Sequence, residues 1–338
     1  MNIRAIALAV FALWSMPAWA GMDLHLPVEC KLGENCFIQN YVDHDAAAGS
    51  FHDYNCGSMT YDDHNGTDFR VKNFDALDSH IRVLATNNGR VKMVTYQPEI
   101  QKGDIPLLQL LKFSTRSECG ASIRIDHGAG WQSIYCHLDP KAMAVKPADD
   151  VVTGQVIGRM GASGKSIFPH LHYELRHHNR PVDPFVGHNK SYNCQPHERY
   201  NLWSEKALEQ LPYIATDIIF GGFTAKEPDV EKIRQRYEPP KFLEATNAAI
   251  YFWVELMGIR THDVVLLTMT APDGKMMVEK KLTYNRHFSL AFETLTAQRQ
   301  AQYSHWPAGV YTVNVTLLRY ENVWKQTVLS RDWQIELQ

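Results

Sequence analysis

The sequence predicts a mainly β protein with two domains and a helical segment between them. The chain has 338 residues, and at roughly 100–200 residues per domain this length favours two domains. Short runs with β-strand patterning alternate with Gly, Asn and Asp turns from about residue 29 to 193, and strand patterning returns after residue 241. With 45% hydrophobic and 21% charged residues, the composition is that of a globular protein, and it excludes a disordered or polytopic membrane chain.

The first domain, residues 21–195, is expected to be an antiparallel β-sheet. Turn residues bound each of its short apolar runs, and His127-Gly128-Ala129-Gly130 reads as the turn of a hairpin. The strands expected most clearly span residues 80–85, 90–96, 121–126, 133–137, 156–160 and 171–176.

The segment 196–240 is expected to be a helical connector, with helices over 205–211 and 229–237. The second helix must end before Pro239-Pro240, because proline cannot continue a helix. Residues 241–338 return to a period of two, and about seven strands in a hundred residues predict an immunoglobulin-like β-sandwich. Alternation is clearest at Tyr311, Val313, Val315 and Leu317, and again at Trp333, Ile335 and Leu337.

The N-terminal residues 1–20 are typical of a signal peptide. Arg4 supplies the positive charge, ten apolar residues follow, and Ala18 and Ala20 are the small residues expected before cleavage at Gly21. Ten apolar residues are too few to cross a bilayer stably, although a retained anchor is the alternative. We therefore expect export to the periplasm or the extracellular space, with no stable membrane insertion after cleavage. The formal charge of -3 provides no basic excess for a nucleic-acid partner.

An even number of cysteines in an exported chain predicts disulfides, with a cysteine-rich zinc site as the competing interpretation. The predicted 127–130 hairpin places Cys119 opposite Cys136, and a short loop joins Cys30 to Cys36. Cys56 and Cys194 remain as the third pair. No CxxC spacing occurs, which disfavours the zinc interpretation.

Two clusters carry side chains suited to chemistry. One is the stretch HNGTD, with His64 and Asp68, and the other is the HLH stretch with His170 and His172. Residues two or four apart share one face of an extended strand, so the members of each cluster can converge. Two imidazoles and a carboxylate are a ligand set that catalytic zinc accepts, but HxH spacing alone is weak evidence.

The order of these stretches resembles the M23 family of zinc metallopeptidases, the lysostaphin and LytM-like enzymes. The resemblance spans roughly residues 29–190 and does not clearly cover the last hundred residues. The stretch CFIQNYVDHD at 36–45 also resembles exported proteobacterial members. The motifs that carry the resemblance are HNGTD at 64–68, YCHL at 135–138, GQVIG at 154–158, GASG at 161–164, PHLHYE at 169–174 and RPVDP at 180–184.

The resemblance implies a LytM-like peptidase domain that holds one zinc ion per chain. It implies that His64, Asp68 and His172 are the zinc ligands, and that His137 and His170 are the paired catalytic histidines beside the metal. The expected activity is hydrolysis of peptidoglycan stem or cross-bridge peptides by a zinc-activated water. The family also contains degenerate members that activate other wall hydrolases, but all five positions are filled here.

Three alternatives to this function stay open at this point. They are a secreted protease of glycine-rich proteins, a non-catalytic wall-binding or amidase-activating module, and a non-haem iron oxygenase, since that metal also takes two histidines and a carboxylate. Lys165 and Phe168 depart from the family pattern before HLH, so specificity is open. Because every candidate residue precedes 241, we expect the C-terminal domain to be dispensable for chemistry, and the oligomeric state is not predicted.

The sequence also makes predictions about other polar residues. We expect His127 to be structural, and His177 and His178 to be solvated. His44 and His52 could contact substrate or support the ligands. Glu174 could orient a ligand or form an outward salt bridge.

Overall fold

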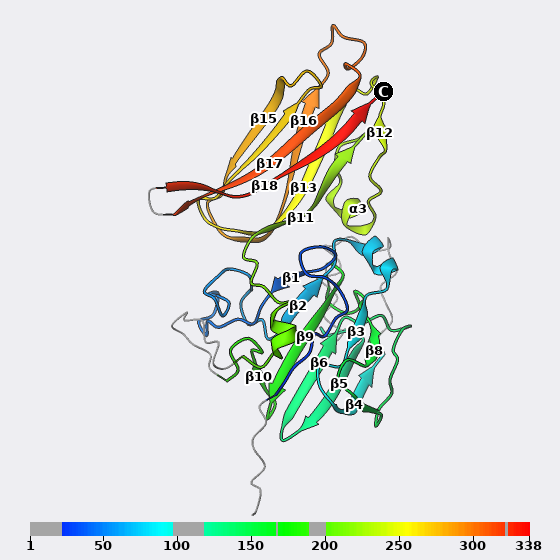
Figure 1. Ribbon diagram of the computed structural model, residues 1–338, viewed down its shortest axis with the longest axis vertical. Coiled ribbons are helices and arrows are strands. Elements are labelled where there is room, and N and C mark those ends of the chain that lie inside the picture. The colour runs from blue at the N-terminus through cyan, green and yellow to red at the C-terminus, as the bar shows by residue number, and fades with distance from the viewer. Residues whose placement is uncertain (1–21, 97–117, 167, 189–200, 322–323) are drawn as a thin grey trace, which may run out of the picture.

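A computed structural model describes residues 22–96, 118–166, 168–188, 201–321 and 324–338. The predicted signal peptide and Cys194 lie outside these described residues. Two β regions are stacked along the long axis of the molecule, and the C-terminus lies at the end farthest from the first region (Figure 1). No helix in the described part of the chain has the length and apolar character needed to span a membrane.

The first region is an antiparallel sheet, as expected. Its order is β1-β2-β9-β6-β5-β4-β7, with β10 also paired to β9. The 127–130 turn joins β5 to β6, and the positive φ values of Gly128, Ala129 and Gly130 form its tight bend. The strands are β1 (Phe37–Asn40), β2 (Thr67–Arg70), β4 (Gly89–Thr95), β5 (Ser122–Gly128), β6 (Trp131–Cys136), β7 (Asp150–Val151), β9 (His170–His177) and β10 (Arg180–Val182).

A separate pair of strands, β3 (Arg82–Leu84) and β8 (Val156–Arg159), completes this region, together with the 3-10 helix η1 (Phe74–Ser79). One hydrophobic cluster fills the interior, and Phe69 and Leu171 from β2 and β9 are fully buried in it. Since side chains alternate along a strand, their neighbours Asp68, Arg70, His170 and His172 project to the opposite face.

The second region consists of two sheets that enclose one hydrophobic cluster. The alternating residues Tyr311, Val313, Val315 and Leu317 are all fully buried in it, as their period predicts. The immunoglobulin-like connectivity stays a prediction. One sheet contains β11 (Asp217–Thr224), β13 (Ala249–Ile259) and β16 (Phe288–Gln298); the other contains β12 (Phe242–Leu243), β18 (Trp324–Leu337), β17 (Gly309–Glu321), β14 (Val264–Thr270) and β15 (Met276–Thr283).

The predicted helical connector over 196–240 is helical only in part. Its helices are the short α2 (Glu205–Leu208) and α3 (Val230–Gln235), and β11 lies between them as a full strand of the C-terminal sheet. Gly221 and Gly222 weaken the strand pattern of β11 in the sequence. Close neighbours favour glycine at both positions: an added Cβ at Gly222 would lie 1.9 Å from the hydroxyl of Tyr237, and one at Gly221 would lie 2.9 Å from the backbone carbonyl oxygen of Trp253.

The two regions share packing and polar contacts. Ile219 and Met257, from β11 and β13, are buried in the hydrophobic cluster of the first region. Gln39 on β1 donates a 2.7 Å hydrogen bond to the backbone carbonyl of Ser289 on β16. The C-terminal region is therefore packed against the sheet that holds the candidate site.

Two of the three predicted disulfides are present. Cys30–Cys36 closes the short loop, and Cys119–Cys136 joins the turn before β5 to the end of β6. The third predicted pair, Cys56–Cys194, involves a residue outside the described part of the chain.

Candidate metal centre

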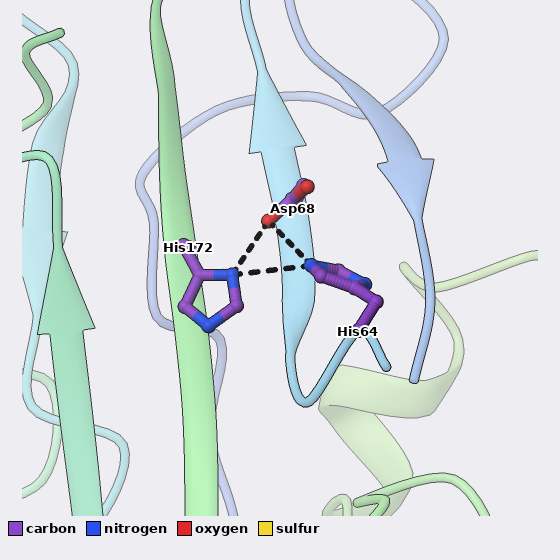
Figure 2. Close-up of side chains that lie close together, drawn as sticks. All are labelled: His64, Asp68 and His172. Atoms are coloured by element: carbon purple, nitrogen blue, oxygen red, sulfur yellow. Dashed lines mark hydrogen bonds and ion pairs between the residues drawn. The ribbon is translucent and has the colours of Figure 1, made fainter. Parts of the chain in front are cut away.

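Three side chains converge at the junction of β2 and β9. Asp68 lies opposite His172 in the β2–β9 register, and His64 comes from the turn that precedes β2 (Figure 2). His172 Nδ1 lies 2.9 Å from Asp68 Oδ1, and His64 Nε2 lies 3.2 Å from each of these two atoms. The cluster thus comes from antiparallel pairing plus one turn, rather than from a continuous extended HNGTD segment.

Hydrogen bonds from outside the cluster fix the orientation of its members. His64 Nδ1–H donates to the backbone carbonyl of Tyr41 over 2.6 Å, which leaves the Nε2 lone pair directed at the cluster. Asn40 donates to Asp68 Oδ2 over 2.8 Å, which leaves Oδ1 for the other two side chains. Each of these two groups therefore presents one defined donor atom.

Gly66, the glycine of the HNGTD stretch, lies where a side chain would clash with β9. A Cβ at Gly66 would lie 2.6 Å from Cε1 of His172 and 2.7 Å from the backbone carbonyl oxygen of Tyr173. Gly66 does not have a positive φ, so the close approach of β9 is what requires it.

His137 and His170 lie beside the cluster as a pair, with ring centroids 4.4 Å apart. His137 Nδ1–H donates to the carbonyl of Ser163 over 2.7 Å, and His170 Nδ1–H donates to the carbonyl of Phe168 over 2.9 Å. Both rings consequently keep Nε2 for other chemistry, and His170 Nε2 is 3.8 Å from Asp68 Oδ1. His137 follows the end of β6 with a φ of 61°, a left-handed conformation that is uncommon outside glycine.

Burial and neighbouring charges shift the pKa values of these groups. Burial acts to raise the pKa of Asp68, but His64 and His170 together with hydrogen bonds hold that pKa well below its usual 3.8. Burial, reinforced by the neighbouring imidazoles of His170 and His172, lowers the pKa of His137 well below its usual 6.5. Burial also lowers the pKa of His170. The pair is thus neutral, whereas the carboxylate beside it is charged.

The donor set fits a divalent metal ion. One ligand atom from each of His64, Asp68 and His172 lies within 4.8 Å of the other two. In the described part of the chain, no other set of His, Cys, Asp and Glu side chains has this spacing. Two imidazole nitrogens and a carboxylate oxygen match the three protein ligands of catalytic zinc sites, which keep a fourth position open.

The remaining predicted candidates lie outside this cluster. His44 pairs with Asp183 over 2.7 Å in a fully buried contact, and His52 lies 3.6 Å from Asp45. Glu174 forms a salt bridge with Arg176, which favours the predicted salt bridge over the predicted role in orienting a ligand.

Most of the other residues named from the sequence have partners outside the cluster. His127 Nδ1–H donates to the carbonyl of Asn88 over 2.7 Å, and its Nε2 lies 2.8 Å from the hydroxyl of Ser133, which agrees with the predicted structural role. His178 is exposed, but His177 is half-buried and stacks on Trp131 at 4.3 Å, so only one of the pair is solvated as predicted. Lys165 is exposed and Phe168 is buried.

The hydrogen bonds that orient the site residues could not be predicted from the sequence. The carbonyls of Tyr41, Ser163 and Phe168 carry no side-chain signal, since any residue supplies a carbonyl. Asn40 lies in the CFIQNYVDHD stretch, and its position one residue before Tyr41 is the one available hint.

Comparisons with known proteins match the part of the chain that holds this cluster. Residues 62–184 match the model of peptidase family M23. Over 65 residues the chain is 40% identical to the DD-carboxypeptidase/endopeptidase Mpg of Neisseria meningitidis serogroup B, covering 19% of this chain and 14% of that protein. Over 120 residues it is 32% identical to the peptidoglycan DD-endopeptidase ShyB of Vibrio cholerae serotype O1, covering 36% of this chain and 22% of that protein.

The chain therefore spans less than a quarter of the length of these curated relatives. Among solved structures, it is similar to a zinc containing peptidase from Vibrio cholerae, with 28% identity and a TM-score of 0.27. That match covers 44% of this chain and 39% of the other.

Proposed function

Because residues 62–184 belong to peptidase family M23, we propose that this protein is an exported zinc metalloendopeptidase that hydrolyses peptide cross-bridges of bacterial peptidoglycan. The observation that carries the proposal is the convergence of His64, Asp68 and His172 beside two further histidines. A metal-binding module would need only the first three residues, whereas hydrolysis also needs groups that move protons.

His64 Nε2, Asp68 Oδ1 and His172 Nδ1 would hold the zinc ion. Zinc held by three protein groups would lower the pKa of a coordinated water to about 7 and would polarise the carbonyl under attack. The charged carboxylate of Asp68 and the Nδ1–H bond of His64 prepare two of the three ligands before any metal arrives.

His137 and His170 supply the proton chemistry. Each donates its Nδ1–H to a backbone carbonyl, so neither Nε2 is used in that hydrogen bond. A neutral Nε2 accepts the proton of an attacking water, and a protonated Nε2 donates to the developing oxyanion or to the leaving amine. The two rings are in contact, so both roles fit within the same small volume.

Peptidoglycan is proposed as the substrate because two relatives are named for endopeptidase activity, one of them on peptidoglycan. The predicted signal peptide would deliver the protein to the periplasm or the extracellular space, where such substrates lie. An oxygenase is disfavoured, because its three-residue facial triad does not account for the buried pair His137 and His170.

The test is digestion of purified sacculi by the zinc-loaded mature protein, with mass spectrometry of the released fragments. We expect fragments cut at a peptide bond, none from Asp68→Ala, and an unchanged pattern from His178→Ala, which alters an exposed histidine. Cleavage of a glycine-rich protein but not of sacculi would favour the secreted-protease alternative. Cleavage of neither would contradict a peptidase and favour the non-catalytic module.

A further inference from the structure

A buried charge cluster links the C-terminal region to β2, two residues beyond Asp68. Arg70 on β2 and Glu255 on β13 are both fully buried, and Arg70 Nη2 lies 3.2 Å from Glu255 Oε2. Arg234, at the end of α3, donates from Nε to Glu255 Oε1 over 2.7 Å. Two guanidinium groups thus share one carboxylate supplied by the C-terminal sheet.

The same guanidinium reaches the candidate site through Phe168. Arg70 Cζ lies 4.5 Å from the centroid of the Phe168 ring, and this ring lies 4.8 Å from the ring of His170. The Phe168 carbonyl also accepts the Nδ1–H of His170. In the β2–β9 register, Arg70 lies directly opposite His170, so this contact is built into the sheet.

Arg70 has no solvent to compensate its charge. Because both side chains are fully buried, the carboxylate of Glu255 compensates the charge of Arg70 in place of solvent. Its other contacts are neutral: the side-chain oxygen of Gln39 at 2.9 Å, and the carbonyls of Val71 and Lys72 at 3.2 Å. Without the Glu255 charge, Arg70 would be an uncompensated buried cation and would be driven away from its place over Phe168.

We propose that Glu255 is a positioning residue for His170, acting through Arg70 and Phe168. The C-terminal domain is then a working part of the peptidase, contrary to the expectation that it is dispensable for chemistry. The proposal also assigns a role to the buried ring of Phe168. It rests on the proposed function in assigning His170 a role in hydrolysis.

The test uses the full chain, with Glu255→Gln as the main variant and Asp263→Asn as its matched control. Asp263 is also a fully buried carboxylate paired with an arginine, Arg319 at 2.7 Å, but this pair lies within the C-terminal region. Ring ¹H–¹⁵N NMR, with His170 assigned by His170→Gln, reports on the imidazole with and without zinc. We expect Glu255→Gln to shift the His170 signals and leave those of His127 in place, whereas Asp263→Asn shifts neither.

Kinetics on a cross-bridge peptide provide the second measurement. Glu255→Gln should lower kcat about 10-fold or more, with KM within about twofold and zinc content unchanged, because misplacement of a catalytic group mainly affects the chemical step. Phe168→Leu keeps the ion pair but removes the aromatic link, so it should reproduce both effects even if Glu255→Gln fails to fold. The double variant should be no slower than the slower single variant, since both act on one path.

Unchanged His170 signals in folded Glu255→Gln and Phe168→Leu would overturn the inference. A double variant whose loss of kcat is the product of the two single losses would overturn it as well. A wild-type protein that cleaves no peptide would instead contradict the proposed function. The NMR comparison would still decide whether Glu255 positions His170.

Discussion

The two ends of β9 both carry clustered histidines, yet only one end forms a metal-binding geometry. His170 and His172 lie at one end; at the other, His177 contacts His178 and His188 at ring-centroid distances of 4.2 and 4.8 Å. The difference is in what surrounds the rings. Within the described residues, a buried carboxylate joins the first group only, and the second group does not have the spacing of a metal site.

Hydrogen bonding at the two ends differs as well. At the first end, backbone carbonyls fix the rings of His64, His137 and His170, and each keeps Nε2 for chemistry. At the second end, His177 Nε2 is itself 3.2 Å from a carbonyl, that of Ala129. Oriented donors next to a charged carboxylate, rather than a density of histidines, make the site.

The largest expected effect comes from removing the carboxylate. Asp68→Ala should lose its zinc and reduce peptide cleavage below detection, since it removes one of three proposed ligands and the charge that balances the ion. Zinc quantification beside a cleavage assay measures both losses. His178→Ala, at the other end of β9, is the matched control and should retain both. Full zinc occupancy in Asp68→Ala would mean that the ligands are assigned wrongly.

Next in size is the loss of either histidine beside the ligands. His137→Ala and His170→Ala should keep zinc and the fold but lose rate by ~10²–10⁴-fold, the usual contribution of general acid–base catalysis. Zinc analysis and single-turnover kinetics separate this result from ligand loss. Zinc release by His137→Ala would place that residue among the ligands instead.

A smaller effect is expected from the residue that orients the carboxylate. Asn40→Ala removes the 2.8 Å hydrogen bond to Asp68 Oδ2, and such supporting contacts typically contribute ~10–100-fold in metal affinity. Competition with a chromophoric chelator measures the affinity. An affinity equal to that of the wild type would show that Asp68 is held by its imidazole neighbours alone.

The smallest effect on chemistry is expected at Gly66. Gly66→Ala forces a Cβ against His172 and the backbone of Tyr173, and such overpacking usually costs about 1–3 kcal/mol of stability. At saturating zinc, kcat should be largely retained. Gly158→Ala is the control, because a Cβ there meets nothing nearer than 3.5 Å. Thermal unfolding of the two variants without metal compares their stability. Equal melting temperatures would argue against a steric role for Gly66.

The sequence predicts features that depend on residues close together along the chain, but not features that depend on residues far apart. Alternation along the strands predicted the buried face of Tyr311 to Leu317, and the 127–130 turn predicted the pairing of Cys119 with Cys136. The strand β11 could not be foreseen, because Gly221 and Gly222 interrupt its pattern and their reason lies in distant side chains. The Arg70–Glu255 pair joins residues 185 positions apart, and no local pattern indicates such a contact.

The most direct test of the central claim is a crystal structure of the zinc-loaded protein with anomalous data collected at the zinc edge. We expect one strong anomalous peak per chain, about 2.0–2.2 Å from His64 Nε2, Asp68 Oδ1 and His172 Nδ1. His137 and His170 should lie beside this peak without coordinating it. A peak coordinated by His137 or His170, a peak at the His177–His188 end of β9, or no peak at all would contradict the proposed metal site.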